Sequence, residues 1–413
     1  MGSLQLRVVL LCSVVAFLDG FDMQSVGPAA KEIATDLNVL TVHFGWLSSA
    51  FQIGFLTGSM VFGPLGDRLG RKWPLVGTTA LFAVCSLAMA VTSSFDLLLL
   101  FRLFAGIGLG GATPIYVSLA SDQAPPDKRA RVVTLMSVAV PLGGMAAGLV
   151  SSVLIPMFGW RAVFFLGGIV PLAATAVIAV ALPKEDVKRP PAAGQRMGTT
   201  TTVQQLFVAE ERVKTTWLWL TSLMVWSALV VNAFWSPTLM QQAGWSVATA
   251  GQMTGVYNLG GVLGTIAIGA APARLRSDQV LMIALAVGGI LIALVGLSLG
   301  SKPLMTGVVF LSGFCTSAAG YALLAFSATV YSAFMRATGV GWALGFGRIG
   351  AVLAPPAAGF LVAGAFPVEQ MYLFFGVPFV LASVFVSLLW REMERRPSHT
   401  RTTTGANPEN VAP

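Results

Sequence analysis

Twelve apolar runs, each long enough to cross a lipid bilayer, dominate this sequence of 413 residues. Only 10% of the residues are charged, against about a quarter in soluble domains, so a soluble fold is excluded. The sequence predicts an all-α membrane protein with twelve transmembrane helices in two six-helix bundles. The runs lie at residues 6–30, 43–65, 73–93, 96–120, 131–156 and 160–182, then at 214–236, 247–271, 279–300, 303–331, 337–365 and 368–390.

A polar interval between the two groups of runs sets the predicted domain boundaries. Residues 183–213 are rich in Pro, Thr and charge, which is typical of a linker. We therefore predict an N-terminal bundle at 1–182, a cytoplasmic linker at 183–213 and a C-terminal bundle at 214–390. Residues 391–413 carry few apolar side chains and are predicted to form a disordered tail.

Lys and Arg residues are distributed unequally between the two sides of this layout. Twenty fall on the side of the termini and the linker, and three, Lys31, Arg161 and Lys302, fall on the other. Because cytoplasmic loops carry the excess of positive charge, both termini and the linker are predicted to be cytoplasmic, in a bacterial inner membrane. The same asymmetry explains the sequence pI near 9.8, so the positive charge does not indicate nucleic-acid binding. We expect membrane lipid, and no nucleic acid, as a partner.

The two halves resemble each other when one is shifted by 206 residues. Residues 48–69 then align with 254–275, which matches Gln52 with Asn258 and three glycines with three glycines. With equal numbers of runs, this predicts an internal duplication, in which the substrate site lies near the midplane where the halves meet.

Four ionisable side chains lie inside the apolar runs: Asp19, Asp22, Arg102 and Arg348. A charge in hydrocarbon is costly, so such residues face protein or water and are candidates for function. Alignment of Pro28 with Pro237 places Asp19 and Asp22 on Ala228 and Val231, and Arg102 falls near Val308 or Val309. We expect the four to meet in a water-accessible chamber. The alternative is that the acids cap a short span.

A resemblance to a known family begins between the second and third runs. Residues 63–72 resemble the signature loop of the major facilitator superfamily, G-x-L-x-D-R-x-G-R-K. Arg102 with Gly106 and Gly108 resembles its fourth-span pattern, which is associated with proton transfer, so the resemblance implies a proton-coupling role for Arg102. The resemblance implies that fold and a conformational or gating role for the signature residues. These are Gly63, Gly66, Asp67, Arg68, Gly70, Arg71 and Lys72.

A narrower resemblance, to the aromatic acid:H⁺ symporter family, covers most of residues 10–390. It rests on LDGFD in the first run, on the run from Arg102 to GIGLGGATP, and on residues 337–360. It implies proton coupling by Asp19 and Asp22, essential membrane charges at Arg102 and Arg348, and a further important base at Arg336. The family's second acidic loop is absent, because Ala273 stands there; its role is lost or has moved to Asp278.

The residues themselves indicate how such a transporter would work. The guanidinium of Arg348 offers paired donors to a substrate carboxylate; the alternative is a permanent ion pair with Asp19 or Asp22. Asp19 and Asp22 are predicted to be a coupled proton site. The predicted pocket also contains Phe21, Gln52, Tyr257, Asn258, Tyr321 and Trp342.

The sequence therefore predicts proton-driven import of a small aromatic carboxylate, such as a hydroxybenzoate, by alternating access. The protein is expected to work as a monomer, to need no cofactor beyond protons and to hold no metal, and no catalytic set indicates an enzyme. Symport or export of a non-aromatic organic anion, and a receptor that binds such an anion without transport, are the alternatives. One proton per monoanion would be electrically silent, whereas two would let the membrane potential drive uptake.

Overall fold

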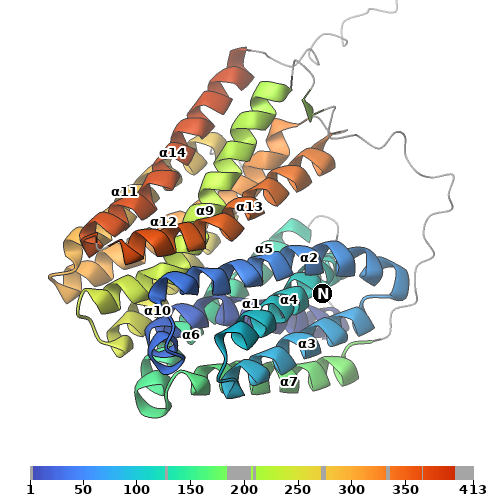
Figure 1. Ribbon diagram of the computed structural model, residues 1–413. Helices are drawn as coiled ribbons and strands as arrows, with labels where there is room; N and C mark the ends of the chain where they lie inside the picture. Colours follow the sequence, from blue (N-terminus) through green and yellow to red (C-terminus); the bar gives the residue numbers. More distant parts are fainter. Residues whose placement is uncertain are drawn as a thin grey trace, which may run out of the picture.

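The structure is a computed structural model in which helices from the two halves of the chain form two groups (Figure 1). It describes residues 3–125, 129–183, 206–207, 211–270, 276–331, 335–364 and 366–395. The all-α fold expected from the sequence is confirmed. We call the end of the bundle at which α7 stops and α9 starts the linker end, and the end at which α1 stops the opposite end.

Helices account for every predicted run. The N-terminal half contains α1 (Ser3–Asp36), a 3-10 helix η1 (Thr41–Phe44), α2 (Gly45–Leu69), α3 (Lys72–Val91), α4 (Phe95–Gln123), α5 (Arg129–Ser137), α6 (Ala139–Phe158) and α7 (Arg161–Ala181). The C-terminal half contains α9 (Arg212–Gln242), α10 (Val247–Ala270), α11 (Ser277–Ser298), α12 (Lys302–Val330), α13 (Arg336–Ala363) and α14 (Val368–Arg395).

Within the described residues, ten helical segments are long and apolar enough to cross a membrane, against the twelve runs predicted. One of the ten segments, Val132–Phe158, contains both α5 and α6, whereas α1 and α2 are not among the ten. These two helices span 34 and 25 residues, so length does not exclude them. They carry the acids of the first run and Gln52, and such polar side chains lower the apolarity of a helix.

The fifth predicted run is divided at Val138, which the sequence analysis did not foresee. Pro141 has no N–H to donate to the carbonyl of Ser137, so the helix cannot continue its regular hydrogen bonding there. The freed carbonyl accepts a hydrogen bond of 3.1 Å from the hydroxyl of Tyr321, on α12 in the other half. A proline in one half thus creates an acceptor for the other half.

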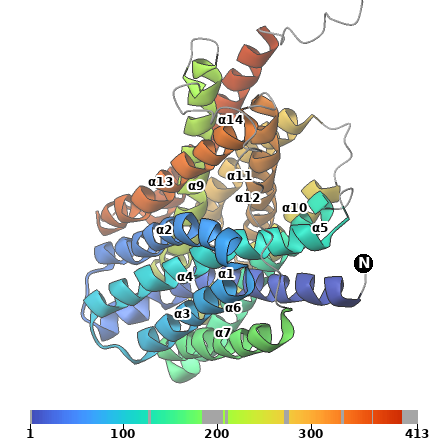
Figure 2. The ribbon, with the colours of Figure 1, turned by 90° about the vertical axis from the view of Figure 1, so that its right-hand side faces the viewer.

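Glycines set the same close helix packing in both halves. A side chain at Gly54 or Gly58 of α2 would collide with backbone carbonyl oxygens of α4. A side chain at Gly260 or Gly264 of α10 would collide in the same way with α12. Because the shift of 206 residues aligned these two pairs of glycines, the structure supports the duplication. The halves meet in several places, one of which is α13 lying along α2 (Figure 1 and Figure 2).

The signature segment is mostly helical, which corrects the prediction of a loop at 63–72. α2 continues to Leu69, and only Gly70 and Arg71 separate it from α3. Gly70 has a φ of 82°, a value that favours glycine, so it makes the turn. A side chain added at Gly63 would lie 3.7 Å from Pro114 of α4, and one added at Gly66 would lie 3.2 Å from Ile115.

The basic residues of this segment contact protein. Arg71 forms an ion pair of 2.5 Å with Asp122 at the end of α4. Lys72 is buried and donates a 2.6 Å hydrogen bond to the carbonyl of Leu182, which follows α7. The side chain of Arg68 is exposed. Two basic residues of the signature segment, Arg71 and Lys72, therefore join helices to each other.

Several predictions lie outside the described residues. They are the side chains of Asp67 and Arg336, the position of Ala273, most of the linker, and the tail from residue 396. Asp278, the suggested substitute for the missing acid, forms an ion pair of 3.2 Å with Arg276.

Candidate functional site

A buried ion pair joins α1 to α4 inside the N-terminal half. Nη1 of Arg102 lies 2.7 and 2.6 Å from the two carboxylate oxygens of Asp22, and both side chains are 4% exposed. The guanidinium also lies 4.4 Å from the ring centre of Phe51 on α2. Removal of one partner from such a pair leaves an uncompensated buried charge, so each of the two residues depends on the other.

Asp19 is buried one turn before Asp22 but has different partners. Its nearest hydrogen-bond partner among the described residues is the hydroxyl of Tyr116 on α4, at 3.4 Å. It lies within electrostatic reach of Arg348, of Asp22 and of Tyr321. The two acids therefore share a helix face, as predicted, but do not share a hydrogen-bond partner.

Arg348 reaches from α13 in the C-terminal half toward α2. Its Nη1 donates a 3.0 Å hydrogen bond to the side-chain oxygen of Gln52. Its guanidinium lies 4.2 Å from the ring centre of Trp226 and 4.5 Å from that of Phe55. No carboxylate of the described chain forms an ion pair with it. The permanent pair with Asp19 or Asp22 that we considered is absent here.

Three other predicted pocket residues lie in the interior of the molecule. Asn258 accepts a 3.5 Å hydrogen bond from Gln24 of the other half. The hydroxyl of Tyr257 lies 2.7 Å from that of Thr316. Tyr321 donates to the Ser137 carbonyl, as described above. Asn258 and Tyr321, like the Arg348–Gln52 contact, thus bridge the two halves.

Phe21 and Trp342 are not brought to this group by their contacts. Phe21 is buried within the N-terminal half, where it packs near Gly167 of α7. Trp342 is 48% exposed and stacks on Trp219 of α9, with ring centres 6.1 Å apart. Both were predicted as aromatic residues that share the cavity, but an aromatic side chain in a helix also packs against its own bundle.

Sequence reasoning missed Tyr116, Gln24, Phe55 and Trp226. Tyr116 lies fourteen residues after Arg102, nearly four turns along the same helix, so the two share a face. Gln24 is a polar residue in an apolar run. These two signals were available, whereas the aromatic partners of Arg348 are set by the packing of α2, α9 and α13.

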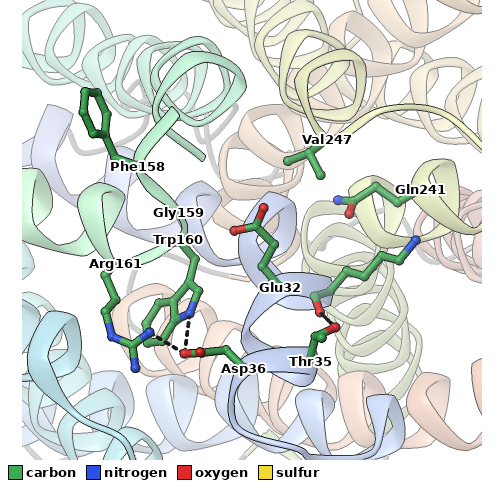
Figure 3. Close-up of a pocket in the computed structure, with 10 residues that line it drawn as sticks. Glu32, Thr35, Asp36, Phe158, Gly159, Trp160, Arg161, Gln241 and Val247 are labelled. Atoms are coloured by element: carbon green, nitrogen blue, oxygen red, sulfur yellow. Dashed lines mark hydrogen bonds and ion pairs between the residues drawn. The ribbon is translucent and has the colours of Figure 1, made fainter. Parts of the chain in front are cut away.

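The cavities differ in size between the centre and the opposite end. A void of about 20 Å³ touches Gln24 and Tyr257, and one of about 10 Å³ touches Gln52 and Arg102. Each is about the size that holds one water molecule. A cavity of about 520 Å³, within the range of ligand sites, lies at the end of α1 (Figure 3). Within the described residues, no cluster of three His, Cys, Asp or Glu side chains could hold a metal.

A comparison with protein families decides what kind of scaffold holds these residues. The family profile described as Major Facilitator Superfamily matches residues 12–299 and 230–413. The chain belongs to the Major Facilitator Superfamily. It is accordingly a multi-pass membrane transporter, and not an enzyme.

Relatives within the superfamily confirm the narrower resemblance. The 4-hydroxybenzoate transporter PcaK of Pseudomonas aeruginosa is 33% identical, with 93% of this chain and 92% of the relative covered. The gallate transporter of Pseudomonas putida is 32% identical, with the same coverage. The 3-(3-hydroxy-phenyl)propionate transporter of Escherichia coli is 34% identical over 86% of each chain.

Solved structures of other transporters show the fold. The nucleoside transporter NupG is 15% identical and superimposes with a TM-score of 0.76, covering 94% of this chain and 100% of its own. The D-xylose-proton symporter is 16% identical and has the same TM-score, with 92% and 97% covered. The predicted superfamily fold, with its two bundles of helices, is thereby confirmed.

Proposed function

We propose that this transporter imports a small aromatic carboxylate, such as a hydroxybenzoate, together with protons by alternating access. The observation that carries the proposal is Arg348, a cation in the interior that has aromatic neighbours and no carboxylate partner among the described residues. The names of the three relatives, transporters of hydroxybenzoate, gallate and hydroxyphenylpropionate, support the same class of substrate.

Arg348 would bind the carboxylate of the substrate. A guanidinium offers two parallel N–H donors that match a carboxylate, and its planar face already packs against Phe55 and Trp226. An aromatic ring attached to the carboxylate would contact the same aromatic side chains. Gln52 of the N-terminal half accepts a hydrogen bond from the guanidinium of Arg348 in the C-terminal half. Substrate binding would replace this hydrogen bond, which joins the two halves, with one to the carboxylate.

Asp19 would accept the transported proton, and Asp22 with Arg102 would hold α1 in position. Asp22 is already stabilised as a carboxylate by two short hydrogen bonds from a cation. Asp19 has one long hydrogen bond from a neutral hydroxyl, so protonation costs it fewer contacts. Its electrostatic contact with Arg348 would couple the proton to the anion, since each changes the charge that the other meets.

The remaining parts of the proposal follow from the charge distribution and the fold. The linker end, with both termini, would face the cytoplasm of a bacterial inner membrane. The protein would act as a monomer in lipid, with protons as its only coupling ion. Rocking of the halves about the central residues would expose Asp19 and Arg348 alternately to each side.

Uptake into proteoliposomes under an imposed pH gradient tests this function. We expect hydroxybenzoates to accumulate when the outside is acidic, and to be displaced by other benzoates but not by dicarboxylates. Asp19→Asn should still exchange labelled for unlabelled substrate but should not accumulate it against a gradient. Equal accumulation by wild type and Asp19→Asn, or equal competition by dicarboxylates, would overturn the proposal.

A further inference from the structure

The largest of the cavities described above lies at the opposite end, far along α1 from Asp19. Its volume is about 520 Å³, and its walls come from both halves: from α1, α6 and α7, and from Gln241 of α9 and Val247 of α10 (Figure 3). A cavity bounded by both halves changes shape whenever the halves move.

Two of the three cations that the sequence places on this side line the cavity. They are Lys31 and Arg161; the third, Lys302, does not. Positive residues are rare on this side of membrane proteins, so their position at one cavity needs an explanation. Arg161 pairs with Asp36, donates to the Thr92 carbonyl and packs on Trp160. Lys31, in contrast, forms no ion pair with a described residue.

One of the two acidic residues of the cavity, Asp36, is held by other groups. Asp36 accepts hydrogen bonds from Arg161 and, at 3.1 Å, from the indole N–H of Trp160. The side chain of Glu32 also lines the cavity. No ion pair joins Lys31 to Glu32 or Asp36, so its ammonium remains available to an anion, while the two carboxylates would repel a second negative charge on that anion.

Gln241 supplies an independent sign of a ligand. Its side chain is 4% exposed and points toward the cavity in Figure 3. Its nitrogen donates a 3.1 Å hydrogen bond to the carbonyl of Pro28 in the other half. Its oxygen is buried and accepts no hydrogen bond from the described residues. A buried acceptor without a donor is costly, and a hydroxyl group of a ligand would satisfy it.

We propose that this cavity is an entry site that binds a hydroxylated aromatic monocarboxylate before the substrate reaches Arg348. Lys31 binds the carboxylate, the carbonyl oxygen of Gln241 accepts the ring hydroxyl, and Trp160 provides an aromatic wall. This inference rests on the proposed function, because the ligand is the proposed substrate. The entry site favours monoanions, since Glu32 and Asp36 disfavour a second carboxylate.

Initial rates of uptake in proteoliposomes distinguish binding at the entry site from a general electrostatic attraction of anions to this side of the protein. Lys31→Gln should raise the KM for 4-hydroxybenzoate about three- to fivefold and leave the maximal rate unchanged. Lys31→Arg should restore the KM. Lys302→Gln, which removes an exposed charge from the same side, is the matched control and should leave the KM as in wild type. Equal changes in Lys31→Gln and Lys302→Gln would overturn the proposal.

A pair of substrates tests the role of Gln241. In wild type, the KM of benzoate should exceed that of 4-hydroxybenzoate, and Gln241→Leu should remove most of this difference. A purely structural role would change both KM values equally, so an unchanged ratio would refute the hydroxyl contact. If wild type transported no aromatic acid, the proposed function would fail; normal transport with these variants unaffected would refute the entry site alone.

Discussion

The helix pairs α2/α4 and α10/α12 have the same packing but different chemistry. In each pair, glycines allow one backbone to touch the other, and the contacts correspond after the shift between halves. The position of Arg102 in α4 corresponds to Val309 in α12, which is buried among apolar residues. The duplicated scaffold therefore accounts for the glycines, which occur in both halves. The charge of Arg102 occurs in the N-terminal half only.

The pairs α1/α6 and α9/α13 extend the comparison. Gly143 approaches the Phe17 carbonyl in one half, and Gly350 approaches the Leu223 carbonyl in the other. In this register, Val225 and Ala228 are the equivalents of Asp19 and Asp22 in the C-terminal half. The proline alignment had given Ala228 and Val231. Both are buried and apolar, so the expectation that the acids have no acidic counterpart is unaffected.

Arg348 of α13 corresponds in the same register to Pro141 of α6. Three of the four interior charges thus lie in the N-terminal half and one in the C-terminal half. The N-terminal half holds the proposed proton chemistry, and the C-terminal half holds the proposed anion site. Coupling between them would act across the interface, where Gln52 meets Arg348 and Gln24 meets Asn258.

Disruption of the buried ion pair, which occurs in one half only, should have the largest effect on transport and stability. Asp22→Asn leaves Arg102 without its carboxylate, so we expect uptake to fall at least about a hundredfold and unfolding in detergent to lose about 3 kcal/mol. The uncharged double variant Asp22→Asn/Arg102→Leu should recover stability but not transport. Val309→Leu at the corresponding position changes no charge and should leave transport as in wild type. Recovery of transport in the double variant would show that transport does not need this pair to hold α1 in position.

The sequence was sufficient to predict the two-bundle fold and the identity of the interior charges. Both depend on quantities that can be read along the chain: the length of an apolar run and the presence of Asp or Arg within it. The glycine register was also predictable, because a shift of 206 aligned Gly54 with Gly260 before any contact was known.

The partners of those charges were not predictable. Asp22 meets Arg102, and Asp19 meets Tyr116, because α4 lies beside α1, a tertiary relation that no local pattern specifies. The division at Val138 was missed because the run remains apolar through Pro141. The extension of α2 to Leu69 was missed because a polar segment was equated with a loop, although Gly70 is where the backbone turns.

Substitution of corresponding glycines should test the shared packing. Gly54→Ala and Gly260→Ala each place a methyl group against a carbonyl oxygen of the neighbouring helix, so each should lower the free energy of unfolding by about 1–3 kcal/mol. Gly77→Ala and Gly307→Ala, one in each half, have open space and are the controls. Thermal unfolding in detergent measures all four. Loss of stability in one half only would contradict the shared packing.

Replacement of the C-terminal charge should separate binding from coupling. Arg348→Lys keeps the positive charge but removes the planar group that packs between Phe55 and Trp226, so the KM for substrate should rise about tenfold. The pH dependence of uptake should persist, since Asp19 is intact. Arg276→Lys is the control, because the guanidinium of Arg276 packs 4.9 Å from the ring centre of Trp390, away from the central site. This variant should leave the KM unchanged. Equal KM values for the two variants would argue against a substrate role for Arg348.

The smallest effect is expected from an ion pair that lies at the opposite end of the N-terminal half. Hydrogen bonds from Arg161 and from Trp160 lower the pKa of the Asp36 carboxyl below its ordinary value. Because the pKa in the folded state is depressed, the stabilisation is complete above the ordinary pKa near 4 and is lost as the pH falls through the lowered one. Both side chains are substantially exposed, so the gain is a few tenths of a kcal/mol. Wild type should therefore melt slightly above Asp36→Asn at pH 7, and the two should converge as the pH falls below the lowered pKa. A difference that grew on acidification would contradict the sign of this shift.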